Sequence, residues 1–180
     1  MKKFYSLILI LIITFMLNGC GKTATDAVKK YLDNYKNLDV NVLTDMKDII
    51  EKENLSDDNS KKYEDIFKKQ YTDLTYQIEK EDYNGDEATI TVKIDVYDLY
   101  KAQKDATTYL ANNSDEFKDS DGKYDSNKFI TYKIDKMKET TERVQYTIDF
   151  YVVNTSDGWV VSSLSNSDIE KIHGIYDYES

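Results

Sequence analysis

The chain has 180 residues, and its 34 acidic side chains against 24 basic ones give a formal net charge of −10. This acidic balance argues against binding to nucleic acid and against adsorption to anionic lipid, because both require a basic face. The length fits one domain with a hydrophobic core, and the single cysteine, Cys20, excludes a disulfide within the chain.

Residues 1–20 have the layout of a secretory signal. Lys2 and Lys3 precede an apolar run over residues 4–17, and small Gly19 precedes Cys20. At ~1.5 Å per residue a helix over this run spans about 21 Å, less than the ~30 Å hydrocarbon core of a bilayer. The sequence therefore predicts a cleaved export signal and disfavours a permanent transmembrane helix.

The stretch Leu17-Asn18-Gly19-Cys20 resembles the lipobox of bacterial lipoprotein precursors. The resemblance implies cleavage after Gly19 and attachment of a diacylglycerol, with palmitate-type acyl chains, to the sulfur of Cys20. Two acyl chains, at ~0.8 kcal/mol per buried methylene, suffice for stable anchoring. We therefore expect a lipoprotein signal peptide over residues 1–19 and a lipidated tether over 20–25, on the outer face of the cell membrane. The alternative is an ordinary secreted protein with one free cysteine.

Three amphipathic helices are predicted at the start of the domain. Thr25 or Asp26 is expected to cap the first and Asp39 the second, and the third covers about residues 57–71. Their apolar stripes are Val28, Tyr31, Leu32 and Tyr35, then Val40, Leu43, Met46, Ile49 and Ile50, then Tyr63, Ile66, Phe67 and Tyr71. The solvated side of the third helix carries Lys61, Lys62, Lys68 and Lys69.

Alternating apolar residues predict two β-hairpins. In the first, the strands around Tyr76 and Ile90 are joined by a turn with Asn84 and Gly85 at its centre. In the second, residues 144–152 form the clearest alternation in the chain. A turn over residues 154–158 then leads back into residues 159–164.

The remaining segments predict helices and turns. Residues 98–117 have a helical pattern, and residues 126–138 fit either a helix or a strand, with Asp125 or Ser126 as a cap favouring the helix. After the second hairpin, Ser167 or Asp168 is expected to cap a last helical turn, and residues 176–180 to form a loose tail.

This order of elements predicts a single α+β domain over residues 26–175, with helices packed on one face of a curved antiparallel sheet of about four strands. The export signal, the opening helix Ala27-Val28-Lys29-Lys30-Tyr31-Leu32 and the closing hairpin Asp157-Gly158-Trp159-Val160-Val161-Ser162-Ser163-Leu164 together resemble small lipoproteins of Gram-positive bacteria that carry a cystatin-like or NTF2-like domain of unknown function. The resemblance implies a cone-shaped fold with a cavity between helix and sheet. Candidate pocket-lining residues are Tyr76, Tyr146, Phe150 and Trp159; the alternative is that they line a packed core.

No residue pattern identifies a catalytic or metal site. His173, the only histidine, is expected at the surface, and alone it builds neither a histidine metal site nor a Ser–His pair. A lipidated Cys20 offers no thiolate. Residues 119–125 depart from an EF-hand loop because Gly122 and Lys123 stand at the wrong positions, so a polar turn is favoured over an irregular calcium site. We expect no cofactor and no metal.

Three functions remain open. The first is a non-enzymatic, membrane-tethered domain that binds a small molecule, a peptide or an envelope protein, and no nucleic acid. The second is a ketosteroid-isomerase-like enzyme, which predicts a deep pocket with a buried carboxylate of raised pKa beside a tyrosine hydroxyl. The third is a structural envelope protein with an exposed apolar patch. The lipid anchor, combined with the missing catalytic set, favours the first.

Overall fold

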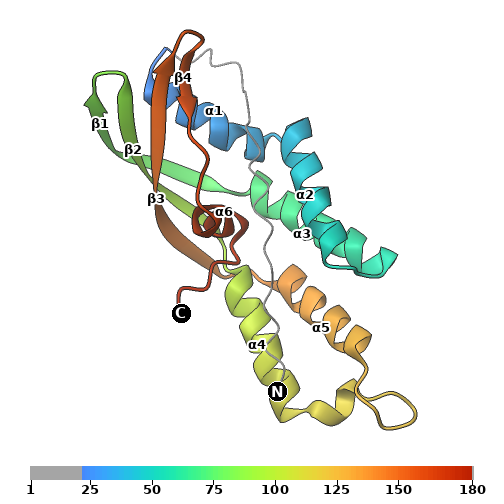
Figure 1. Ribbon diagram of the computed structural model, residues 1–180. Coiled ribbons are helices and arrows are strands. Elements are labelled where there is room, and N and C mark those ends of the chain that lie inside the picture. The colour runs from blue at the N-terminus through green and yellow to red at the C-terminus, as the bar shows by residue number, and fades with distance from the viewer. Residues whose placement is uncertain (1–21, 180) are drawn as a thin grey trace, which may run out of the picture.

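A computed structural model describes residues 22–179, which form six α-helices, one short 3₁₀ helix and four β-strands (Figure 1). In chain order the elements are α1 (Ala24–Lys36), α2 (Val40–Lys52), α3 (Asp57–Thr72), β1 (Thr75–Asn84), β2 (Glu87–Tyr97), α4 (Leu99–Asn112), η1 (Ser114–Phe117), α5 (Ser126–Glu139), β3 (Arg143–Thr155), β4 (Gly158–Val161) and α6 (Asn166–His173).

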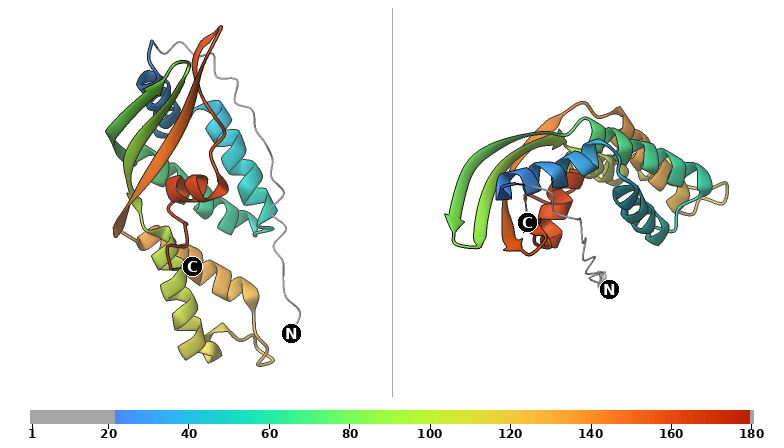
Figure 2. Two further views of the ribbon diagram at one scale, coloured as in Figure 1. Left: turned by 60° about the vertical axis from the view of Figure 1, so that its left-hand side comes forward. Right: turned by 90° about the horizontal axis from the view of Figure 1, so that it is seen from above.

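The four strands form one antiparallel sheet in the order β1-β2-β3-β4. The sheet curves, and α1 lies on its concave side (Figure 2). A bulge between Ile78 and Lys80 interrupts the pairing of β1 with β2, and bulges of this kind increase local twist. The prediction of an α+β fold, with helices on one face of a curved antiparallel sheet of four strands, is confirmed.

The main core lies between α1 and the concave face of the sheet. Every second residue of β2 from Ala88 to Val96 is buried, as is every second residue of β3 from Tyr146 to Val152. Val28 and Leu32 of α1 are fully buried against them. The alternation of the strands puts their polar residues on the opposite face.

Two helix starts differ from the prediction. α1 begins two or three residues earlier than its predicted caps Thr25 and Asp26 allow, because the Thr23 side chain accepts a hydrogen bond from the Asp26 amide. α6 is capped by Ser165, whose hydroxyl accepts from the Asp168 amide, so Ser167 and Asp168 lie inside the helix. Asp39 caps α2 as predicted.

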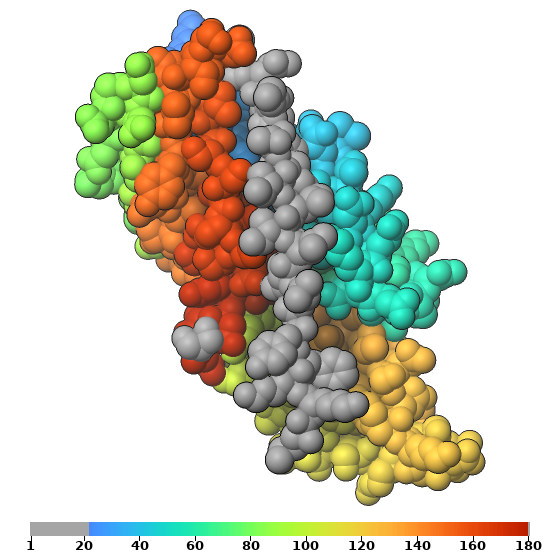
Figure 3. Space-filling view, in the orientation of Figure 1, coloured from blue at the N-terminus to red at the C-terminus, as the bar shows by residue number. Residues whose placement is uncertain are grey.

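The ambiguous segment after residue 125 is a helix, as favoured. The Asp125 carboxylate accepts hydrogen bonds from the amides of Asn127 and Lys128 and so caps α5. The predicted helix over 98–117 is divided into α4 and the 3₁₀ helix η1. α4 and α5 form a helical hairpin that makes up the end of the molecule away from the tips of β1 and β2 (Figure 3).

The C-terminal part is more tightly packed than expected. His173 is buried, with its ring 5.3 Å from that of Phe67 and 5.6 Å from that of Tyr71, so the prediction of a surface histidine is wrong. The expected loose tail also makes contacts, because Tyr178 donates a hydrogen bond to Asp98 and Glu179 pairs with Lys104. The chain is folded back here because α6 turns at Gly174 against α3 and the end of β2.

Candidate functional site

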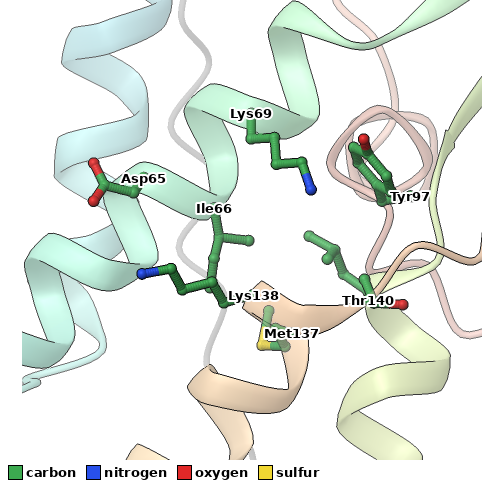
Figure 4. A pocket seen from close by; sticks show the side chains of 8 residues that line it. Asp65, Ile66, Lys69, Tyr97, Met137, Lys138 and Thr140 are labelled. Atoms are coloured by element: carbon green, nitrogen blue, oxygen red, sulfur yellow. The ribbon is translucent and has the colours of Figure 1, made fainter.

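A hollow of about 190 Å³ lies where α3, the end of β2 and the end of α5 meet (Figure 4). Its lining residues are Asp65, Ile66, Lys69, Tyr97, Leu99, Met137, Lys138 and Thr140. This volume is below the ~300–1,000 Å³ of most sites for drug-sized ligands, so it suits a small ligand or one end of a larger ligand.

The floor of the hollow is apolar and rigid. Ile66 of α3, Leu99 of α4 and Met137 of α5 are all buried, and they belong to one hydrophobic cluster that joins the helical hairpin to α3. Side chains fixed in a packed cluster keep their positions when a ligand arrives. The floor is therefore preformed.

Tyr97, the last residue of β2, is held in place through its backbone. The Gln70 side chain is fully buried; its carbonyl oxygen accepts from the Tyr97 amide at 2.9 Å and its amide nitrogen donates to the Tyr97 carbonyl at 3.3 Å. These bonds extend the pattern of a strand partner beyond the sheet. The Tyr97 hydroxyl also donates to Asp73 at 2.8 Å.

Two cations flank the Tyr97 ring. The Lys69 ammonium lies 4.4 Å from the ring centroid and the Arg143 guanidinium carbon 4.8 Å from it, both within cation–π range. Arg143 is fixed by an ion pair with Asp95 and by hydrogen bonds to the carbonyls of Asp73 and Asp95. Partial burial opposes ionisation of Asp95, but hydrogen bonds from Arg143 and Gln145 outweigh it and lower the pKa of this carboxyl.

The Lys69 ammonium group differs from the Arg143 guanidinium group in its charged partners. Among residues 22–179 no carboxylate forms an ion pair with Lys69. Its side chain extends over the hollow toward Tyr97, whereas Asp65 and Lys138 stand at the opposite rim (Figure 4). A cation above an apolar floor is complementary to a small apolar group that carries a negative charge.

The four pocket residues predicted from the sequence lie elsewhere. Tyr146 and Phe150 belong to the main core, and Tyr76 and Trp159 pack against it, so the structure does bring all four to the concave face. Phe150 is fully buried, with its ring 5.8 Å from that of Tyr31, and the Tyr76 hydroxyl donates to Asp33 at 3.0 Å. None of the four lines the hollow beside Tyr97.

The predicted anchor lies outside the described residues. Leu17, Asn18, Gly19 and Cys20 all precede residue 22, so the lipobox and the lipidation site stay predictions. Within residues 22–179, no helix is long and apolar enough to cross a bilayer.

The enzyme hypothesis needs an acid–base pair inside the cone. The buried residues of β2 and β3 on the concave face include no carboxylate, but Asp98, which directly follows β2, is 6% exposed and accepts a hydrogen bond from the Tyr178 hydroxyl. Burial, and then the charge of Asp48, raise the pKa of Asp45, but Asp45 belongs to α2. The ketosteroid-isomerase-like activity stays an untested alternative.

Metal binding receives no support from the part of the chain that is described. No group of three or more His, Cys, Asp or Glu side chains is arranged there to hold an ion. In the loop that superficially resembled a calcium site, one carboxylate oxygen of Asp119 accepts from the amides of Asp121 and Lys123 at 2.9 Å each. These bonds are those of a polar turn.

Comparison of the chain with protein families, with curated proteins and with solved structures found no match.

Proposed function

We propose that this protein is a non-enzymatic binding domain, anchored by lipid to the outer face of the cell membrane, and that the hollow beside Tyr97 holds a small amphipathic anion. The anchor is proposed from the lipobox-like residues 17–20. The observation that carries the binding site is the Lys69 ammonium, which lies over an apolar floor without a carboxylate partner among residues 22–179.

The two halves of such a ligand would be bound by different forces. Burial of an apolar group against Ile66, Leu99 and Met137 contributes roughly 25 cal/mol per Å² removed from water. The carboxylate or phosphate end would lie at the rim beside Lys69, where a charge-assisted hydrogen bond contributes about 1.5–3 kcal/mol.

The net charge of the chain limits where attraction for an anion can arise. At a net charge of −10 the protein repels anions at long range, and salt screens that repulsion over about 10 Å at ~0.1 M. Affinity for an anion must therefore come from contacts inside the hollow. Asp65 and Lys138 at the opposite rim carry opposite charges, so Lys69 supplies the net positive charge of the hollow.

Titration with hexanoate tests the site. Lys69→Gln keeps a long polar side chain and removes the charge, and we expect it to weaken hexanoate binding at least fivefold in a heteronuclear NMR titration. Lys61→Gln is the matched control, because Lys61 lies on the same helix and does not line the hollow.

Hexanol supplies the second comparison, because it has the same apolar chain without the charge. We expect hexanol to bind more weakly than hexanoate to the native protein and equally to native protein and Lys69→Gln. Equal hexanoate affinity in Lys69→Gln and Lys61→Gln, or resonance shifts confined to residues away from the hollow, would contradict the proposal.

A further inference from the structure

Asp98 is a buried carboxylate without a cation. It is 6% exposed, and it caps α4 by accepting from the Lys101 amide at 2.9 Å. Its second oxygen accepts from the Tyr178 hydroxyl at 3.0 Å. Within residues 22–179 no lysine, arginine or histidine forms an ion pair with it. A buried charge of this kind is costly unless a counter-charge or several hydrogen bonds compensate it.

The side chain of Tyr146 places a second buried polar group near Asp98. Its side chain is 8% exposed, and in the described part of the chain its hydroxyl has no hydrogen-bond partner. Burial raises the pKa of this phenol, and the nearby charge of Asp98 raises it further. A buried polar atom left without a partner costs about 1–3 kcal/mol, which a ligand that bonded it would recover.

Residues 176–179, here called the C-terminal strap, cover both groups. The Tyr176 ring lies 5.7 Å from the ring of Tyr146, and the Tyr178 ring lies 4.9 Å from the ring of Tyr100 and 6.5 Å from that of Tyr146. Glu179 pairs with Lys104 on α4. Tyr178 is 41% exposed and the Lys104–Glu179 pair is exposed, and each ring or polar contact of the strap contributes only about 0.5–1.5 kcal/mol, so the strap can open without unfolding the domain.

Once the strap opens, the exposed groups are complementary to one kind of ligand. The Asp98 carboxylate and the Tyr146 oxygen both accept hydrogen bonds, and the faces of Tyr100 and Tyr146 attract cations. A protonated primary amine donates up to three N–H bonds and carries the missing positive charge. A neutral alcohol supplies the bonds without the charge.

We propose that Asp98, Tyr146 and Tyr100 form a binding site for a primary alkylammonium ion, which Tyr178 of the C-terminal strap occupies when no ligand is bound. The Tyr178 hydroxyl then stands in for one N–H donor of the ligand. This site shares no residue with the hollow beside Tyr97 and binds a ligand of opposite charge. A result that contradicts one of the two proposals would therefore leave the other unaffected.

The test is an NMR titration of the full chain with butylammonium chloride. In Tyr178→Ala the competing side chain is gone, and we expect butylammonium to bind at least tenfold more tightly than to the native protein. Adding Asp98→Asn to Tyr178→Ala should weaken binding at least tenfold, because asparagine still caps α4 but lacks the charge. Tyr124→Ala, which removes an exposed tyrosine from a loop outside the site, should leave affinity unchanged.

Two further ligands and one milder variant keep the test decisive. Butanol should bind at least tenfold more weakly than butylammonium to Tyr178→Ala, and tetramethylammonium, which has no N–H donor, should also bind more weakly. If Tyr178→Ala does not fold, Tyr178→Phe removes the hydrogen bond to Asp98 and keeps the ring, and a tightening of about threefold is expected. Equal affinity for butanol and butylammonium, no tightening in either Tyr178 variant, or no loss with Asp98→Asn would overturn the proposal.

Discussion

The imidazole of His173 packs against Phe67 and Tyr71, and burial lowers its pKa to about 4. A histidine in the unfolded chain titrates near ~6.5. The folded state therefore keeps His173 neutral at a pH where the unfolded state takes up a proton. Its contribution to stability is fully present above about pH 6.5 and is lost as the pH falls toward 4.

Because the pKa of His173 is lower in the folded state than in the unfolded state, we expect the free energy of unfolding to depend on pH. Between pH 7 and pH 5, His173 should lower the free energy of unfolding by about 2 kcal/mol, because one pKa unit corresponds to 1.36 kcal/mol. His173→Phe has a similar size and does not titrate, so the loss between pH 7 and pH 5 should be smaller by this amount. Urea unfolding of both proteins at the two pH values measures it, and parallel losses would show that His173 is not the titrating group.

At the scale of elements, Gly174 controls how closely α6 approaches α3 and β2. It ends α6 with φ of 72°, and a Cβ atom there would lie 2.2 Å from the Gln70 amide nitrogen and 2.2 Å from the Tyr97 carbonyl oxygen. Gln70 is the residue that fixes the backbone of Tyr97. The close approach of α6 is therefore linked to the candidate site.

Gly174→Ala should destabilise the protein by roughly 2–4 kcal/mol, through left-handed backbone strain and a clash that Gln70 relieves only by releasing Tyr97. Gly122→Ala is the control, because Gly122 has φ of 78° with no atom within 4 Å of the added Cβ. The unfolding free energy of Gly122→Ala should fall only by the contribution of backbone strain, about 1 kcal/mol. Chemical denaturation of the two variants measures the difference, and equal losses would mean that the contact with Gln70 and Tyr97 does not limit packing.

Neighbouring residues of β3 give a test of the core. Phe150 is fully buried, whereas Tyr151 is 63% exposed on the opposite face. Phe150→Ala should cost about 3–5 kcal/mol of unfolding free energy. Tyr151→Ala should stay within about 0.5 kcal/mol of the native protein. A loss below about 1 kcal/mol for Phe150→Ala would contradict the placement of this face in the core.

The strands and most helices could be predicted because their signal is local. In β3 the strict alternation fixes which residues face inward, since a shift of one residue would bury the polar set. The two helix caps were missed because hydroxyl groups stand two residues apart, at Thr23 and Thr25 and at Ser165 and Ser167. Residue type alone does not say which one has the extended backbone of a cap.

The candidate site could be predicted only in part. Ile66 belonged to a predicted apolar stripe, but Lys69 was placed on the solvated side of the same helix. Lys69, Tyr97 and Arg143 meet through the packing of α3 against the ends of β2 and β3. No local sequence pattern indicates that these three residues lie close together in the fold. The burial of His173 was missed for the same reason, because α6 is short and the aromatic residues that cover it lie on α3.

At the scale of the whole molecule, the proposed anchor and the folded domain lie close together along the chain. α1 begins at Ala24, so a chain that starts at a lipidated Cys20 spans at most about 14 Å before the first helix. The domain would then be held next to the membrane surface, with its acidic body excluded from anionic lipid. The candidate binding sites would face ligands of the envelope and not of the cytoplasm.

The measurement that tests this account most directly is the intact mass of the native protein extracted from membranes. We expect a chain that begins at Cys20 and carries a diacylglycerol on its sulfur, whereas Cys20→Ser should yield an unlipidated product. A native protein with a free Cys20 thiol, or one that retains residues 1–19, would contradict the account.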